Sequence, residues 1–216
     1  MTRGRRLVAE GLGTAFLTAV VVGSGIMAEH LAAGNVALAL LANAIAAGAG
    51  LAALILMLGP VSGAHLNPAL TLSEAWQGNM PASEVAPYLV SQVVGAFAGI
   101  AATHLMFDAP IFFAADTVRT GAALWWSEFV ATFGLIAVIM GCSRSRPEVT
   151  PFAVGAYVMS SFWFTSSSAF ANPAVTLAKA ASNTFAGIRP SDTPGFIAAQ
   201  LLGAAAATLL FGWLYP

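Results

Sequence analysis

One stretch of sequence occurs twice, as Asn67-Pro-Ala-Leu-Thr-Leu-Ser-Glu-Ala75 and as Asn172-Pro-Ala-Val-Thr-Leu-Ala-Lys-Ala180, and the copies match at six of nine positions. Asparagine is a favoured helix N-cap, and proline suits the first helical position. Each copy therefore predicts a short helix, over Pro68–Gln77 in the first half and over Pro173–Ser182 in the second. About ten residues at a rise of about 1.5 Å span about 15 Å, which is half the hydrocarbon thickness of a bilayer.

The composition places these short helices in a membrane. The chain has 216 residues, of which 58% are hydrophobic and 8% charged, whereas soluble domains are about 25% charged. The net charge of −1 and the lack of a basic stripe exclude a nucleic-acid partner. A single cysteine, Cys142, leaves no intrachain disulfide and no metal-ligand spacing. We therefore expect a membrane protein without a metal or cofactor.

Six segments are apolar and long enough to cross the bilayer as helices. They are Leu7–Glu29, Val36–Gly59, Glu84–Phe107, Leu124–Cys142, Pro151–Thr165 and Thr193–Tyr215. The two Asn-Pro-Ala copies each follow the second segment of their half. Two short helices that enter from opposite faces would meet at the midplane as a seventh, discontinuous span.

Two further elements recur in the same order in each half. Each half opens with a glutamate inside an apolar segment, Glu10 or Glu128, and closes with Gln-x-x-Gly-Ala, which begins at Gln92 or Gln200. Because each half holds three spans, an odd number, the second half must insert upside down relative to the first. This pattern predicts an inverted-topology repeat.

The predicted fold is all-α, with six transmembrane helices, two re-entrant half-helices and an inverted three-helix repeat. It is one domain over residues 1–216, with a first repeat at 7–107 and an inverted second repeat at 121–216. Ionisable groups inside a membrane need partners. We expect Glu10 and Glu128 to be structural, each accepting backbone N–H bonds from the non-helical segment ahead of its half-helix.

These non-helical segments are expected to line a watery cavity, because irregular backbone at membrane depth survives only there or inside protein. The amides of Asn67 and Asn172 would donate to a solute at the centre. Each helix N-terminus carries about +0.5 charge, so two such ends, each about 4 Å from a monovalent cation, disfavour the cation by about 4 kcal/mol at an effective dielectric of about 20. The expected lining carbonyls are those of Gly63, Ala64, His65, Ser168 and Phe170.

The sequence resembles the aquaporin (major intrinsic protein) family. The resemblance rests on the paired Asn-Pro-Ala motifs, the lead-in Ser62-Gly-Ala-His65 and the two helix glutamates, and it extends over nearly the whole chain. It implies a passive channel for small uncharged solutes, not an enzyme, that assembles in membrane lipid as a homotetramer with one pore per subunit. The implied pore centre consists of Asn67, Pro68, Ala69, Asn172, Pro173 and Ala174.

The chain departs from the family pattern at one position. In the family the second motif usually continues with an arginine, whereas here Val175 follows. Family spacing places the other three residues of the four-residue constriction at Ala47, Ser160 and Ala169. All four side chains are small or medium, which predicts a wide, uncharged opening that passes glycerol, urea, undissociated metalloid hydroxides such as arsenous acid (arsenite) and also water.

Two other functions remain open from the sequence. One is a water-selective aquaporin, which the small constriction residues disfavour, although the flanking Phe162, Trp163 and Phe164 can refill the gap. The other is a weakly selective cation channel, which the loss of the arginine makes conceivable, yet no acidic ring lines the expected path. An intramembrane enzyme would need a nucleophile with a base, or clustered metal ligands, and the sequence has neither.

The positive charges predict the orientation of the chain. Arg3, Arg5 and Arg6 precede the first span, and Arg144 and Arg146 follow the fourth. Six spans put these positions on one side of the membrane, and the positive-inside rule makes that side cytoplasmic. We expect a multi-pass protein of a bacterial inner (plasma) membrane with both termini in the cytoplasm.

Overall fold

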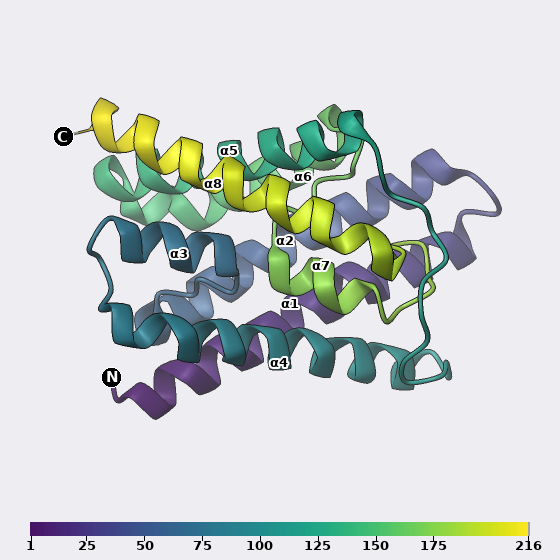
Figure 1. Ribbon diagram of the computed structural model, residues 1–216. Coiled ribbons are helices and arrows are strands. Elements are labelled where there is room, and N and C mark those ends of the chain that lie inside the picture. Colours follow the sequence, from purple (N-terminus) through teal and green to yellow (C-terminus); the bar gives the residue numbers. More distant parts are fainter. Residues whose placement is uncertain (216) are drawn as a thin grey trace.

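The computed structural model describes residues 1–215, which form eight α-helices and two short 3₁₀ helices. Six of the α-helices are long and lie alongside one another, and two are short and lie inside the bundle (Figure 1). In chain order they are α1 (Arg3–Leu31), α2 (Val36–Ser62), α3 (Pro68–Trp76), α4 (Ala82–Met106), α5 (Ala122–Ser145), η1 (Pro147–Val149), α6 (Thr150–Phe164), α7 (Pro173–Lys179), η2 (Pro190–Asp192) and α8 (Thr193–Leu214).

The fold class is the expected one, and the helix ends differ by a few residues. Five helices within residues 1–215 are long and apolar enough to cross a membrane; α6, with 15 residues, is shorter. The second half-helix ends at Lys179, not at Ser182. It stops early because the following backbone pairs with the loop between α4 and α5: Phe113 donates its N–H to the carbonyl of Ala181, and Ala115 donates to that of Ala180.

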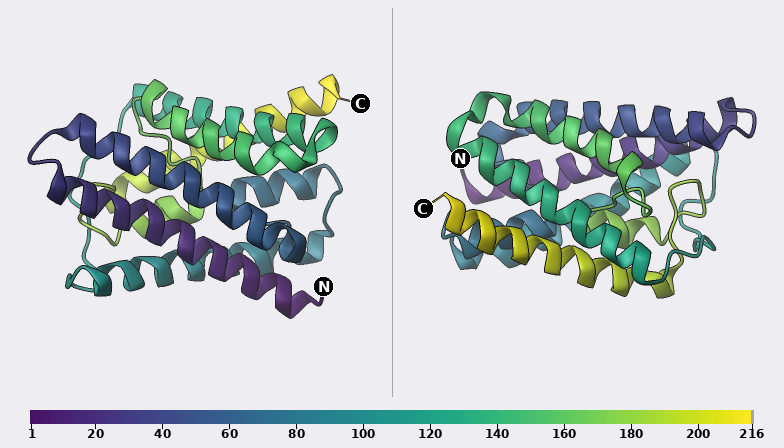
Figure 2. Two further views of the ribbon diagram at one scale, coloured as in Figure 1. Left: turned by 180° about the vertical axis from the view of Figure 1, so that it is seen from behind. Right: turned by 90° about the horizontal axis from the view of Figure 1, so that it is seen from above.

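The two halves of the chain pack in the same way (Figure 2). In the first half α1 packs against α2 and α4, and in the second half α5 packs against α6 and α8. The two halves meet mainly where α2 packs against α6. The half-helices α3 and α7 each contact both α4 and α8, and they touch each other near the middle of the bundle (Figure 1).

Glycines let the long helices approach closely. A Cβ atom on Gly95 of α4 would lie 2.1 Å from the carbonyl oxygen of Gly11 in α1, and one on Gly203 of α8 would lie 2.3 Å from that of Phe129 in α5. Small residues at such crossings allow van der Waals packing between helices in a lipid solvent that offers little hydrophobic drive. The two crossings therefore require the absence of a side chain.

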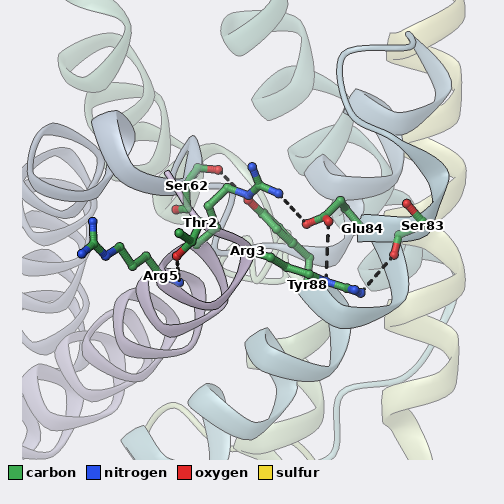
Figure 3. A network of polar contacts seen from close by, with 8 residues as sticks. Thr2, Arg3, Arg5, Ser62, Ser83, Glu84 and Tyr88 are labelled. Carbon is green, nitrogen blue, oxygen red and sulfur yellow. Dashed lines mark hydrogen bonds and ion pairs between the residues drawn. The ribbon is translucent and has the colours of Figure 1, made fainter.

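A polar cluster joins α1 to α4 at the end of the bundle where α1 begins (Figure 3). Arg6 Nη2 donates to Glu84 Oε2 at 2.9 Å, and Arg3 Nε lies 3.5 Å from Glu84 Oε1. Tyr88, one turn after Glu84, donates its hydroxyl to the carbonyl of Ser62 at 3.0 Å. The cluster thus holds the end of α2, which is where the first non-helical segment begins.

Gly95→Ala should destabilise the protein, because the added methyl group must push α1 and α4 apart. Overpacking of this kind costs about 1–3 kcal/mol, which corresponds to a fall of about 2–12 °C in the melting temperature of the purified protein. The control is Gly212→Ala in α8, where an added Cβ would meet nothing within 4 Å. Equal melting temperatures for the two variants would contradict the close crossing.

Candidate functional site between the two half-helices

Asn67 and Asn172 cap the two half-helices. Asn67 Oδ1 accepts a hydrogen bond from the N–H of Ala69 at 2.9 Å, and Asn172 Oδ1 accepts from Ala174 at 3.1 Å and Val175 at 3.3 Å. Both asparagines have extended backbones, with φ of −157° and −152°. The side chains therefore satisfy N–H groups of the first helical turn that have no partner within the helix.

The same two asparagines tie the halves together. Asn67 Nδ2 donates to the carbonyl of Ala171, and Asn172 Nδ2 donates to the carbonyl of Leu66, both at 2.8 Å. These reciprocal bonds bring the N-termini of α3 and α7 to a common point inside the bundle (Figure 1). A carboxamide nitrogen carries two hydrogens. Each asparagine therefore keeps a second N–H that can donate to another group.

Glu10 holds the non-helical segment ahead of α3. Its side chain is fully buried in α1 and accepts backbone N–H bonds from His65 at 2.9 Å and Leu66 at 2.7 Å. The Ser62 hydroxyl and the Gln92 amide donate to it at 2.7 and 2.8 Å. Unpaired backbone N–H groups are costly in an apolar interior, so this carboxylate supplies the acceptors that the segment lacks.

Glu128 holds the segment ahead of α7 with matching bonds. Phe170 and Ala171 donate their backbone N–H groups to it at 2.9 Å, and the Gln200 amide donates at 2.6 Å. Three alanine and serine residues here have positive φ, a conformation that such residues adopt only when their surroundings impose it. They are Ser168 (61°), Ala169 (46°) and Ala171 (47°).

Three cavities follow one another along the bundle. The central one is lined by both capping asparagines. It shares Phe162 and Lys179 with an outer cavity beneath the loop between α4 and α5. It shares Ala64 and His65 with an inner cavity at the end where α1 begins. The shared lining residues place the three cavities end to end.

Two kinds of residue line the central cavity. One kind consists of aliphatic residues from α1, α2, α5 and α6. The other consists of the two non-helical segments, Ala64–Asn67 and Ser168–Asn172. The aliphatic residues are Leu17, Val21, Leu51, Ile55, Leu135, Ile139, Val154 and Val158.

Comparison with known proteins agrees with this geometry. The profile of the major intrinsic protein family matches residues 1–166. The chain belongs to that family. It is 54% identical to aquaglyceroporin AqpS of Rhizobium meliloti over 97% of this chain and 90% of that protein. It is 31% identical to the probable aquaporin AqpM of Archaeoglobus fulgidus over 99% of this chain and 98% of that one.

The fold also matches that of a solved aquaporin. The aquaglyceroporin of Plasmodium falciparum superposes with a TM-score of 0.73 at 20% identity, covering 99% of this chain and 96% of that one. At that identity the likeness shows the fold alone. The family membership and the matching fold together show that this aquaporin is a multi-pass membrane channel for small solutes and not an enzyme.

Three of the four residues expected in the aquaporin constriction, Ala47, Ala169 and Val175, line the central cavity. Most of the residues whose carbonyls were expected to line the path border it as well. Gly63 borders the inner cavity instead. The remaining residues of the two motifs, Pro68, Ala69, Pro173 and Ala174, are buried in the first turns of α3 and α7 and are not among the residues that line the central cavity.

Ser160, expected in the constriction, is not among the residues that line the three cavities. It is exposed, and its hydroxyl donates to the carbonyl of Tyr157 at 2.8 Å. Residues four apart share a face of a helix, and the face of α6 that meets the cavity carries Val158 and Phe162. Ser160 lies two residues from each and therefore points the other way. The structure thus places an aromatic ring where a serine was expected.

Sequence reasoning missed two cationic residues at the outer cavity. Lys179, in α7, borders both the central and the outer cavities, and Arg119, in the loop between α4 and α5, borders the outer one. The spacing of four residues between Val175 and Lys179 was a usable signal, because such residues share a helix face. Nothing in the sequence predicted the path of the loop that carries Arg119.

Glu128→Gln should weaken the second non-helical segment. The substituted carboxamide has one acceptor oxygen and turns an NH₂ group toward N–H donors, which leaves a buried donor unpaired. An unsatisfied buried group costs about 1–3 kcal/mol, so both the melting temperature and the solute flux should fall. The control is Glu148→Gln, at an exposed position in η1. Unchanged melting and flux in Glu128→Gln would contradict this role.

Proposed function

We propose that the three cavities form the permeation path, and that it conducts water and small uncharged solutes larger than water. Glycerol, urea and undissociated metalloid hydroxides such as arsenous acid are the solutes that fit this chemistry. The observation that carries the proposal is the lining of the central cavity, in which aliphatic residues occur together with the two capping asparagines and the non-helical segments ahead of them. The named aquaglyceroporin relative at 54% identity supports it.

The two kinds of lining residue match the two kinds of group in a polyol, its hydroxyl groups and its C–H groups. Burying hydroxyl groups is unfavourable unless they find hydrogen-bond partners, and the carbonyls of Gly63, Ala64, His65, Ser168 and Phe170 are the proposed acceptors. The free N–H groups of Asn67 and Asn172 are the proposed donors at the centre. The C–H groups of the solute then lie against the aliphatic wall. Hydrogen bonds to this lining would replace the hydrogen bonds to water that a polyol loses when it enters the cavity.

The proposed constriction consists of Ala47, Phe162, Ala169 and Val175. Val175 is shorter than an arginine and carries no charge, so it leaves room for a solute wider than water. Phe162 replaces Ser160 in this ring, because among the α6 residues that line the central cavity it is the one that also lines the outer cavity. The ring therefore selects by shape and apolar contact on three sides, and backbone supplies the polar contacts.

We propose that residues 7–107 and 121–216 are inverted repeats; Pro216 lies outside the described residues. Glu10 and Glu128 occupy equivalent places, each binding two consecutive backbone N–H groups ahead of a half-helix. The half-helices point in opposite directions from their meeting point (Figure 1). The bonding pattern thus repeats with the sequence.

The proposed orientation puts both termini in the cytoplasm, and the proposed assembly is a homotetramer. The arginines at the start of α1 and the end of α5 lie at one end of the bundle, which supports the orientation through the positive-inside rule. The family resemblance supports the tetramer. The similarity to a protein of Rhizobium meliloti supports a bacterial membrane, for which we propose the inner one.

A solute panel tests the proposed function directly. Proteoliposomes that contain the protein should swell rapidly in iso-osmotic glycerol, urea or arsenous acid, and should also show fast water flux, whereas empty liposomes should not. Light scattering in a stopped-flow instrument measures all four rates. Fast water flux with no flux of the larger solutes would overturn the proposal in favour of a water-selective channel.

Substitutions at the constriction should change selectivity in opposite directions. Val175→Arg should reduce glycerol flux by about tenfold or more and water flux less, because the longer side chain narrows the ring, whereas Phe162→Ala should raise glycerol flux severalfold. The control for the second is Trp163→Ala, whose side chain is 50% exposed, whereas that of Phe162 is 7% exposed. Equal glycerol-to-water ratios in all variants would place the constriction elsewhere.

A further inference from the structure

The outer cavity gathers the positive charge that the constriction lacks. Lys179 is the last residue of α7 and follows Val175 by one helical turn, so the two side chains share a face. Lys179 also borders both the central and the outer cavities. Its side chain therefore lies at the junction through which a solute would pass from one cavity to the other.

The side-chain amine of Lys179 is buried and forms no ion pair within residues 1–215. The residue is 4% exposed. Nζ lies 3.1 Å from the centroid of the Phe170 ring, a cation–π arrangement. No side-chain hydrogen bond joins it to the described part of the chain, so its N–H donors stay available to groups inside the cavities.

Arg119 brings a second cation to the same ring. Its guanidinium carbon lies 5.1 Å from the centroid of Phe170. Nε donates to the carbonyl of Gly187 at 2.8 Å, while Nη1 and Nη2 donate to those of Ser167 and Phe185, each at 3.4 Å. Three of the five N–H groups are used in this way. The bonds hold the loop against the second non-helical segment and fix the charge at the outer cavity.

No acidic side chain offsets these two charges among the residues that line the outer cavity. The nearby carboxylate of Asp192 is engaged elsewhere: it pairs with Arg189 at 2.9 Å and accepts the backbone N–H of Arg119 at 2.9 Å. The inner cavity differs, because Glu74 accompanies Arg144 there.

Glu128 acts on both cations through space, but its carboxylate is bound by the N–H groups of Phe170 and Ala171 and does not line any of the three cavities. Among the residues that line the cavities, basic side chains therefore outnumber acidic ones only toward the outer end.

We propose that Lys179 and Arg119, gathered on the ring of Phe170, form a cationic collar that excludes cations in place of the absent arginine. This inference rests on the proposed permeation path. Selection by size and selection by charge then occur at different places along the path. The size limit is set by the constriction of Ala47, Phe162, Ala169 and Val175, and cations are excluded at the collar. A neutral solute passes the collar as a hydrogen-bond acceptor, whereas a cation meets two like charges in a confined space.

Lys179→Met tests the collar, because methionine keeps the length of the side chain and removes its charge without breaking any side-chain hydrogen bond. Passive K⁺ efflux from proteoliposomes should rise about tenfold or more, since a unit charge several ångströms away is weakly screened in such a cavity. Glycerol flux should change much less than K⁺ efflux, because the variant leaves in place the backbone carbonyls and the two asparagines that bind the solute in the proposed path. The control is Arg146→Gln, an exposed cation that borders none of the three cavities, and it should leave K⁺ efflux unchanged.

A rescue variant separates the collar from a general loosening of the fold. Lys179→Met combined with Val175→Arg should return K⁺ efflux toward the wild-type level, because it restores a cation one turn away. Wild-type K⁺ efflux in Lys179→Met, with glycerol flux intact, would overturn the collar while leaving the proposed function in place. A leak that the added arginine does not reduce would overturn it too. Absence of glycerol flux in the wild-type protein would instead overturn the proposed function.

Discussion

The structure depends on how two non-helical segments are satisfied inside an apolar bundle. Backbone N–H and C=O groups at that depth have no bulk water to bind. Two consecutive N–H groups in each segment bind one buried carboxylate, Glu10 or Glu128, and one carbonyl in each segment binds the asparagine of the other half. Without those acceptors and donors, backbone groups of both segments would be left unpaired, which is costly in an apolar interior.

This arrangement determines which backbone groups remain for a solute. In a trans peptide the C=O group points opposite to the N–H group, so the carbonyls of the peptides whose N–H groups bind Glu10 and Glu128 point away from these carboxylates. The asparagines use one amide hydrogen for the opposite segment and one oxygen for their own helix. The groups that remain unbonded are several backbone carbonyls and one N–H of each asparagine. In the proposed path, the N–H groups of these peptides therefore hold the fold, and their carbonyls bind the solute.

Much of this follows from the sequence because the determining signals are local. Asn followed by Pro predicts a capped helix, and its length sets the depth of the half-helix. Glu10 and Glu128 are conspicuous because charged residues are rare inside membrane helices. The site residues on α6 were harder to place. Ser160 was positioned by counting back from Asn172 through a turn of irregular backbone, and an error of two residues there reverses the face of a helix.

The residues that sequence reasoning missed depend on long-range contacts. Arg119 comes from a loop with no periodic pattern, and its place is set by carbonyls more than forty residues away. Lys179 has a local interpretation as a cation at a helix C-terminus, which is favourable by itself. Only the ring of Phe170 and the two cavities show that it also faces the path. In the proposed path, the constriction carries Val175 in place of the usual arginine, and the positive charge of Lys179 lies one helical turn further outward. A wider solute can then pass the constriction, while cations are still repelled. The two functions can be separated because Coulomb repulsion acts over several ångströms, whereas steric exclusion acts only at contact.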